Sequence, residues 1–140
     1  MLNREWQTAL LCSLGAWLDY SDLEGRTFLA KRVTGTVEGV EDEAGNVYAA
    51  YRADPTVLLC AHMDVHPDGI GYDDAVGCAI ADLVIAETNT VAALFTVGEE
   101  TGGIGVREAL PHLPDSIRAC LVLDRCASFE VVDSISGKAL

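Results

Sequence analysis

The chain has 140 residues, of which 22 are Asp or Glu and 9 are Lys or Arg, so its formal net charge is −13. This acidity argues against binding to nucleic acid or to an anionic membrane surface, because both require clustered basic side chains. Half of the residues are hydrophobic, and no apolar run reaches the roughly 18 residues that a membrane-spanning helix needs. We expect one globular domain over residues 1–140.

The five cysteines are typical of a reducing compartment. Their number is odd and none forms a CxxC pair, and most lie in apolar runs, where a free thiol behaves as a small hydrophobic group. The N-terminal residues lack the apolar stretch of a signal peptide. We therefore expect a cytoplasmic protein. The cysteines are Cys12, Cys60, Cys78, Cys120 and Cys126.

The first third of the chain predicts two helices and a hairpin. Apolar residues recur at helical spacing over 4–18, and Ser21 or Asp22 is suited to cap a short second helix that ends near Lys31. Two β-type runs, 33–40 and 46–52, then flank a Gly-Asn turn signal and predict a β-hairpin.

The remaining elements alternate between apolar strands and helices with short connections, which is typical of a layered α/β domain. Right-handed crossovers place the two later helices on one face unless the chain reverses between them, and the first helices are available to cover the other face. We expect a three-layer α/β/α fold with a mixed, largely parallel sheet and an N-terminal β-hairpin, shortened at the C-terminus. The expected strands are 56–63, 91–98, 118–125 and an edge strand 129–135, and the expected helices are 73–87 and 102–113.

Acidic residues and one histidine follow the carboxyl ends of the predicted strands, where open α/β sheets bind ligands. Charged residues also mark strand ends without any function, but several carboxylates gathered in one place repel each other unless a cation neutralises them. A histidine with several carboxylates suits Zn²⁺, with Mn²⁺ or Co²⁺ as substitutes. The residues are His62, Asp64, Asp73, Asp74, Glu99, Glu100 and Asp124.

Two of the motifs suggest separate roles for their members. Asp64 lies two positions after His62, so both side chains point to the same side of a strand and Asp64 can accept the second ring N–H. Glu99 and Glu100 diverge on an extended chain. One of them is suited to bind metal and the other to take a proton from water.

In order and spacing, these motifs resemble the co-catalytic zinc exopeptidases, a superfamily of aminopeptidases, carboxypeptidases, dipeptidases and deacylases. The resemblance spans roughly residues 33–130. It is carried by His62-Met63-Asp64, Asp73-Asp74, Glu99-Glu100 and Asp124.

The resemblance implies a role for each residue. It implies that His62 and Asp124 bind one metal ion, that Asp73 bridges two ions and that Glu100 binds the second. It further implies that Glu99 is the general base, that Asp64 orients His62, and that the Asp73-Asp74 peptide bond is cis. The cofactor implied is one or two zinc ions.

The chain departs from the family's pattern at the second metal, because no histidine follows Asp124. His66 is an unusual substitute ligand, and His112 lies beside a proline and is expected at the surface. We also expect the chain to lack the lid or dimerisation domain of many relatives.

Two functional hypotheses follow. The chain is a metal-dependent hydrolase that cleaves a terminal peptide bond or an N-acyl amino acid, or it is a reduced or truncated relative that binds metal or a partner without turnover. An exposed sheet edge would favour self-association.

Overall fold

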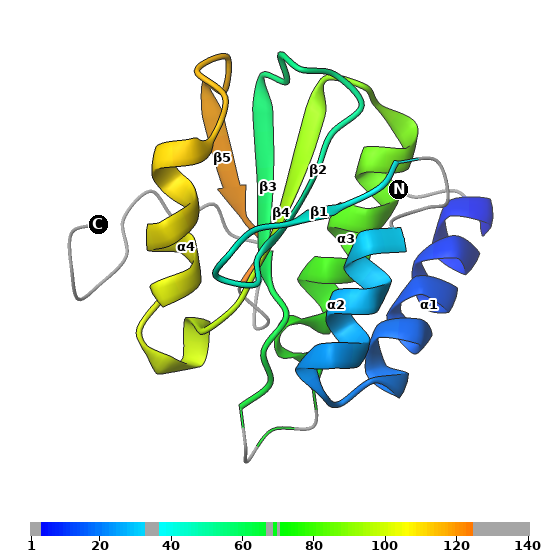
Figure 1. Ribbon diagram of the computed structural model, residues 1–140. Helices are drawn as coiled ribbons and strands as arrows, with labels where there is room; N and C mark the ends of the chain where they lie inside the picture. Colours follow the sequence, from blue (N-terminus) through cyan, green and yellow to red (C-terminus); the bar gives the residue numbers. More distant parts are fainter. Residues whose placement is uncertain (1–3, 33–36, 67–68, 70, 125–140) are drawn as a thin grey trace.

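The computed structural model describes residues 4–32, 37–66, 69 and 71–124. A mixed five-stranded sheet separates two helical layers (Figure 1), so the predicted α/β fold is confirmed. The helices are α1 (Arg4–Asp19), α2 (Leu23–Arg32), α3 (Tyr72–Glu87) and α4 (Ile104–Ala109), with short 3₁₀ turns at Glu99–Thr101 and Leu110–His112. The strands are β1 (Val40–Glu41), β2 (Val47–Ala49), β3 (Val57–His62), β4 (Val91–Thr96) and β5 (Ala119–Val122).

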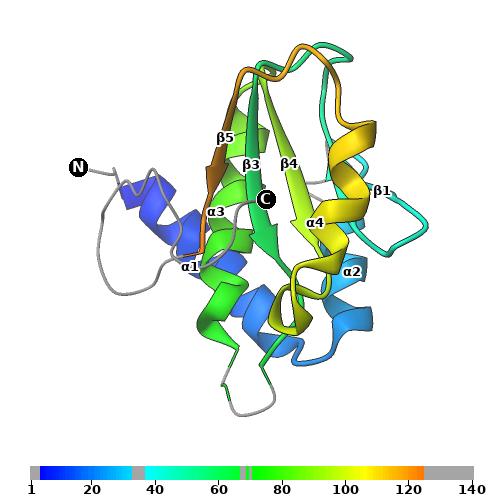
Figure 2. The same cartoon turned by 90° about the vertical axis from the view of Figure 1, so that its left-hand side faces the viewer.

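The sheet order β1-β2-β4-β3-β5 explains where the helices lie. Strand β3 is parallel to both β4 and β5, and β2 is antiparallel to β4. Because β4 and β5 flank β3 on opposite sides, the chain reverses between its two crossovers. Helices α3 and α4 therefore cover opposite faces of the sheet (Figure 2).

The position of the first two helices differs from the sequence-based expectation. Helix α1 packs against α3, so it lies on the same side of the sheet as α3 and does not cover the opposite face. The reason is that Leu10, Leu14 and Trp17 of α1 join the core that α3 forms over the sheet. The predicted cap of α2 is confirmed, since the Asp22 carboxylate accepts the Gly25 N–H at 2.9 Å.

The central strands are buried on both faces, as their unbroken apolar sequences predict. Alternate side chains of β3 and β4 point to opposite faces of the sheet and pack into two separate hydrophobic cores. On the α3 side, Phe95 stacks on Trp17 with ring centroids 5.5 Å apart. On the α4 side, Leu58 and Leu94 pack with Ala109.

The outer strands are shorter or more exposed than predicted. The hairpin is confirmed, but its first strand covers only Val40–Glu41, and residues 33–36 lie outside the described residues. Strand β5 is not buried, because it forms the edge of the described sheet, and Leu121 and Val122 are 50% and 58% exposed. The predicted edge strand 129–135 lies outside the described residues.

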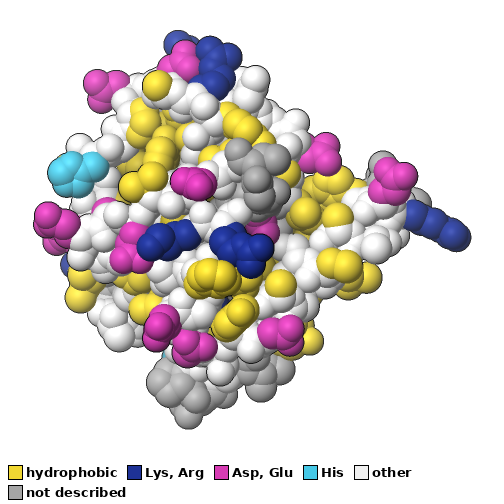
Figure 3. Space-filling model, turned by 45° about the vertical axis from the view of Figure 1, so that its right-hand side comes forward, with side chains coloured by type: hydrophobic (Ala, Val, Ile, Leu, Met, Phe, Trp, Pro, Cys, Tyr) yellow, Lys and Arg dark blue, Asp and Glu magenta, His cyan; other side chains and the backbone are white. Residues whose placement is uncertain are grey.

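Acidic side chains are scattered over the face shown in Figure 3, between exposed hydrophobic groups and in places beside Lys or Arg side chains. On this face the negative charge of the chain is therefore dispersed. Within the described residues, no helix combines the length and apolarity needed to cross a bilayer.

The Trp17–Phe95 stack makes a testable contribution to stability. Trp17 is 1% exposed, so Trp17→Ala leaves a cavity between α1 and the sheet and should lower the free energy of unfolding by about 3–5 kcal/mol. Urea denaturation followed by circular dichroism measures this loss. Leu11→Ala, on the exposed side of the same helix, is the matched control and should change stability by less than about 0.5 kcal/mol. Equal losses in the two variants would contradict the described packing.

Candidate metal centre

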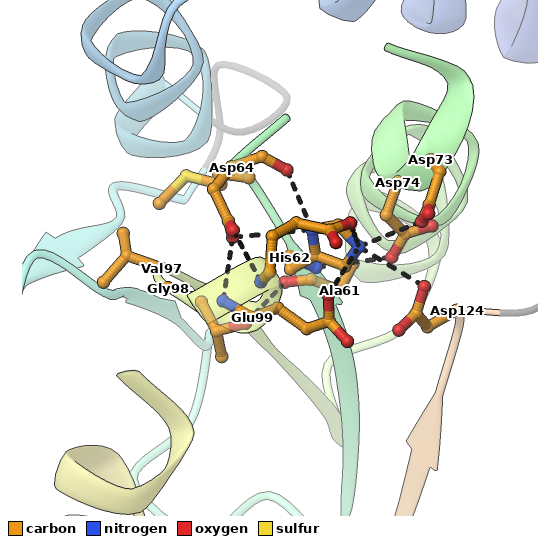
Figure 4. Close-up of polar contacts among 12 residues, drawn as sticks. Ala61, His62, Asp64, Asp73, Asp74, Val97, Gly98, Glu99 and Asp124 are labelled. Carbon is orange, nitrogen blue, oxygen red and sulfur yellow. Dashed lines mark hydrogen bonds and ion pairs between the residues drawn. The ribbon is translucent and has the colours of Figure 1, made fainter. Parts of the chain in front are cut away.

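Four segments of the chain bring polar side chains to one rim of the sheet. His62 is the last residue of β3, Asp73 lies at the start of α3, Glu99 follows β4 and Asp124 follows β5. Because β3, β4 and β5 are parallel, their carboxyl ends lie at the same edge. Figure 4 shows the side chains converging on His62, with Asp73, Asp74 and Asp124 on one side of the ring and Asp64 on the other.

The Nε2 atom of His62 is the centre of the cluster. His62 is 2% exposed, and its Nε2 lies 3.0 Å from Asp73 Oδ1 and 3.3 Å from Asp124 Oδ1. The carboxylates of Glu99 and Glu100 lie 3.7 and 3.9 Å from the same atom. All four carboxylates therefore face a single imidazole nitrogen, at the one rim of the sheet where the sequence predicted them.

The other ring nitrogen is held by the backbone of Asp64. His62 Nδ1 lies 2.9 Å from the Asp64 carbonyl oxygen and 3.5 Å from its carboxylate. The main partner is thus the carbonyl group, whereas the sequence suggested the carboxylate. In the neutral tautomer, Nδ1–H donates to this carbonyl and leaves the Nε2 lone pair directed at the carboxylates, as a metal ligand requires.

The Asp64 carboxylate instead holds the turn that carries the paired glutamates. It accepts the backbone N–H of Glu99 at 3.2 Å and that of Glu100 at 2.9 Å. Burial raises the pKa of Asp64, but hydrogen bonds from His62 and from these two amides outweigh burial and lower it to about 2. A permanently charged Asp64 thereby ties the end of β3 to the segment that follows β4.

The Asp73-Asp74 peptide bond is cis, as expected. Asp73 points toward His62, and its side chain is 53% exposed. Asp74 is buried and accepts the backbone N–H groups of Gly77 at 3.0 Å and His62 at 3.3 Å. Asp74 therefore joins the start of α3 to the end of β3, a role that sequence reasoning did not assign.

Gly77 explains how α3 comes close enough to the site. A Cβ atom at this position would collide with the Leu123 carbonyl and with the Asp74 carboxylate. The glycine therefore lets α3 pass directly against the segment that leads from β5 to Asp124. The Leu123 N–H also donates to the Cys60 carbonyl at 2.8 Å, which continues the pairing of β5 with β3 up to the site.

The donor atoms fit a divalent metal ion. They form two sets, His62 with Asp73 and Asp124 and His62 with Glu99 and Glu100, and within each set the atoms lie within 4.8 Å of one another. One nitrogen with several carboxylate oxygens is a ligand set that zinc accepts. Among the described residues, none of the ion pairs of these carboxylates involves a Lys or Arg side chain.

The electrostatics show how strongly the cluster attracts positive charge. Burial lowers the pKa of His62, but hydrogen bonds to Asp124 and Asp64 outweigh it and raise the pKa to about 12. Burial and the negative charge of Asp124 raise the pKa of Asp74 to about 8. The pKa of Glu99 is also raised, first by burial and then by neighbouring carboxylates. Without a metal ion, protons therefore neutralise part of the site.

The other two histidines lie outside this arrangement. His66 and His112 are both exposed, and neither belongs to the donor sets found among the described residues. The expectation of a surface position for His112 is confirmed. His66, the unusual ligand considered from the sequence, belongs to neither donor set.

Asn46 supports the site through its side chain, although the sequence indicated only that it lies in a turn. Its side chain is 1% exposed, and its Oδ1 accepts the Val97 N–H at 3.0 Å while its Nδ2 donates to the Gly105 carbonyl at 2.8 Å. These bonds hold both ends of the segment that contains Glu99. An Asn after a glycine indicates a turn but not that its amide is turned inward.

The pKa shifts predict how the metal-free protein responds to pH. Asp74 and His62 both have folded-state pKa values above their unfolded values, about 3.9 and 6.5. Their stabilising contributions are lost as pH rises, from about 4 to 8 for Asp74 and from about 6.5 to 12 for His62. The free energy of unfolding of chelator-treated protein should therefore fall between about pH 6 and about pH 8.5, as measured by urea denaturation. Zinc should reduce this fall because it replaces the protons, and a stability that rises over the same range would contradict the described site.

Comparisons with known proteins found similar structures but no similar sequences. No protein-family model and no curated protein matches the sequence. Solved structures do match. A tripeptidase from Staphylococcus aureus aligns with a TM-score of 0.61 at 22% identity, over 86% of this chain and 44% of its own. Aminopeptidase PepT from Bacillus cereus aligns with a TM-score of 0.65 at 21% identity, over 85% and 43%.

A third structure, described as a Zn-dependent exopeptidase from Bacteroides vulgatus, aligns with a TM-score of 0.54 at 18% identity, over 82% of this chain and 58% of its own. The chain thus spans about half the length of the peptidases that it matches. At these identities the likeness shows the fold. The chain has the α/β fold of these peptidase structures.

Proposed function

We propose that the chain carries the metal centre of a zinc-dependent hydrolase that cleaves a terminal peptide bond or an N-acyl amino acid. The observation that carries this proposal is the convergence of four carboxylates on His62 Nε2, at 3.0 to 3.9 Å. The peptidase names of the structural neighbours support the substrate class. Zinc is the favoured ion, and Mn²⁺ or Co²⁺ can replace it with the same ligands.

One of the two donor sets supports the first metal site. His62, Asp73 and Asp124 form a complete three-residue set for one ion. In the proposed centre, Asp73 would also serve as a ligand of a second ion, together with Glu100. A bound zinc ion would supply a Lewis acid for the scissile carbonyl and acidify a water molecule.

Glu99 is the proposed general base. Its side chain is 43% exposed, so it can reach both the cluster and a substrate, and its raised pKa brings it closer to neutral pH. Glu99 takes a proton from the attacking water and passes it to the leaving amine. Asp64 contributes indirectly, because it holds the Glu99 amide and the His62 ring in place.

A second function is a module that binds metal or a partner without turnover. The supporting observation is that both donor sets share His62, so the described residues offer one imidazole for up to two ions. A single bound ion with no hydrolytic activity would favour this alternative. The exposed β5 edge would then be the surface for self-association.

The metal centre itself is tested by zinc content. Wild-type protein purified without chelator should contain one or two zinc ions per chain by elemental analysis. His62→Ala should abolish this binding, since both donor sets include His62. His112→Ala is the matched control, because His112 is exposed and outside the sets, and it should retain the full zinc content. Wild-type protein that contains none of zinc, manganese and cobalt would refute the centre.

The catalytic role of Glu99 is tested separately from metal binding. Glu99→Gln keeps the size of the side chain but removes the base, so kcat should fall about 10²–10⁴-fold on dipeptide, tripeptide and N-acyl amino acid substrates. Its zinc content should stay at the wild-type level. Glu108→Gln, on the exposed surface of α4, should leave kcat unchanged. If wild-type protein binds zinc but hydrolyses none of these substrates, the non-catalytic alternative is favoured.

A further inference from the structure

Arg26 is an unusual residue in the interior of this protein. Its side chain is 0% exposed, whereas every other Lys and Arg among the described residues is exposed. Burial lowers the pKa of its guanidinium, but an arginine remains charged at any working pH. Burying a charge is costly unless every donor is satisfied. Its contacts therefore show what this charge does.

All three guanidinium nitrogens of Arg26 donate to backbone carbonyls. Nε donates to Tyr20 at 2.8 Å, Nη1 to Met63 at 3.2 Å and Nη2 to Gly71 at 2.9 Å. Met63 directly follows His62, and Gly71 lies two residues before Asp73. One side chain of α2 thus binds both ends of the connection between two proposed metal ligands.

The two bound carbonyls belong to well-fixed backbone. The Met63 N–H donates to the Thr96 carbonyl at 2.8 Å, which attaches it to β4. The Gly71 carbonyl also accepts the Ala75 N–H at 3.3 Å, across the non-helical Asp73 and Asp74 at the start of α3. Arg26 therefore joins the end of a strand to the beginning of a helix at the point where their metal ligands meet.

Gly71 is adapted to this contact. Its φ is +96°, a conformation that favours glycine. A Cβ atom at this position would lie 2.9 Å from Arg26 Nη2, which is too close for a packed contact. The glycine permits both the backbone turn and the approach of the guanidinium.

We propose that Arg26 is a positioning residue for the metal centre, which sets the separation between His62 and Asp73 by holding the Met63 and Gly71 carbonyls. This inference rests on the proposed function. His62 Nε2 and Asp73 Oδ1 lie 3.0 Å apart, and metal affinity depends on their relative placement. Loss of outer contacts that orient metal ligands weakens metal binding by about 10–100-fold.

The test compares Arg26→Lys and Arg26→Met with wild-type protein. Lysine keeps the charge but has a single nitrogen, so it cannot hold three carbonyls in the planar arrangement of a guanidinium. Zinc affinity is measured by competition with a chromophoric chelator, and the ligand geometry by the visible absorption spectrum of the Co²⁺-loaded protein. Both variants should bind zinc about 10–100-fold more weakly and show an altered Co²⁺ spectrum.

Two control variants separate positioning from general effects. Ile85→Ala removes a buried side chain near the other end of α3 and lowers stability without touching the connection. Arg107→Met removes a positive charge from the exposed surface of α4. Circular dichroism confirms that each variant is folded during the metal titration. Both controls should retain wild-type zinc affinity and the wild-type Co²⁺ spectrum.

The outcomes are distinguishable. If folded Arg26→Lys binds zinc with wild-type affinity and spectrum, the positioning role is wrong, while the proposed metal centre stands. If Arg26→Met does not fold, Arg26→Lys alone decides. Weakening of the same size in Ile85→Ala or Arg107→Met would attribute the effect to stability or net charge and overturn the inference. If wild-type protein binds no zinc, the proposed function fails and this inference fails with it.

Discussion

The central constraint on this structure is the repulsion between carboxylates that surround one buried imidazole. Four of them lie within 3.9 Å of His62 Nε2, and charges of the same sign at such spacing oppose folding unless positive charge joins them. A proton on His62 supplies that charge in the absence of metal, which is why the pKa of this group is raised to about 12. A divalent cation would supply more positive charge than a single proton. The protein therefore has to hold its ligands in place against their own repulsion.

The scaffold meets this requirement with buried polar side chains that each join two segments. Arg26 holds the connection between His62 and Asp73, and Asn46 holds the segment around Glu99. Asp64 joins these two regions, because its carbonyl contacts the His62 ring and its carboxylate accepts the Glu99 amide. Hydrophobic packing alone orients helices and strands, but it does not fix loop carbonyls and amides at hydrogen-bonding precision. The ligand loops depend on these polar contacts for their geometry.

The sequence predicted most of the helices and strands and the convergence of the candidate ligands. The remaining features could not be predicted, for physical reasons. Unbroken apolar runs predict buried strands, and strand ends in an α/β sheet share a rim, so His62 and Asp124 could be placed together. The exposure of β5 could not be seen, because an edge strand and a central strand have the same apolar composition. Local patterns do not reveal which face α1 covers, since that depends on the sheet order. The buried position of Arg26 leaves no local signal, because its partners are backbone carbonyls.

Strand β5 couples the metal site to the edge of the described sheet. It pairs only with β3 among the described strands, its side chains face solvent, and it leads directly to Asp124. A cation bound between Asp124 and His62 would link the end of β5 to the end of β3 and so stabilise the pairing of these two strands. By thermodynamic reciprocity, docking of the strand raises the affinity for the cation by the same factor by which the bound cation favours docking. A further strand that pairs with the outer edge of β5 in the described sheet would stabilise the docked position of β5. It would therefore also raise the affinity for the metal.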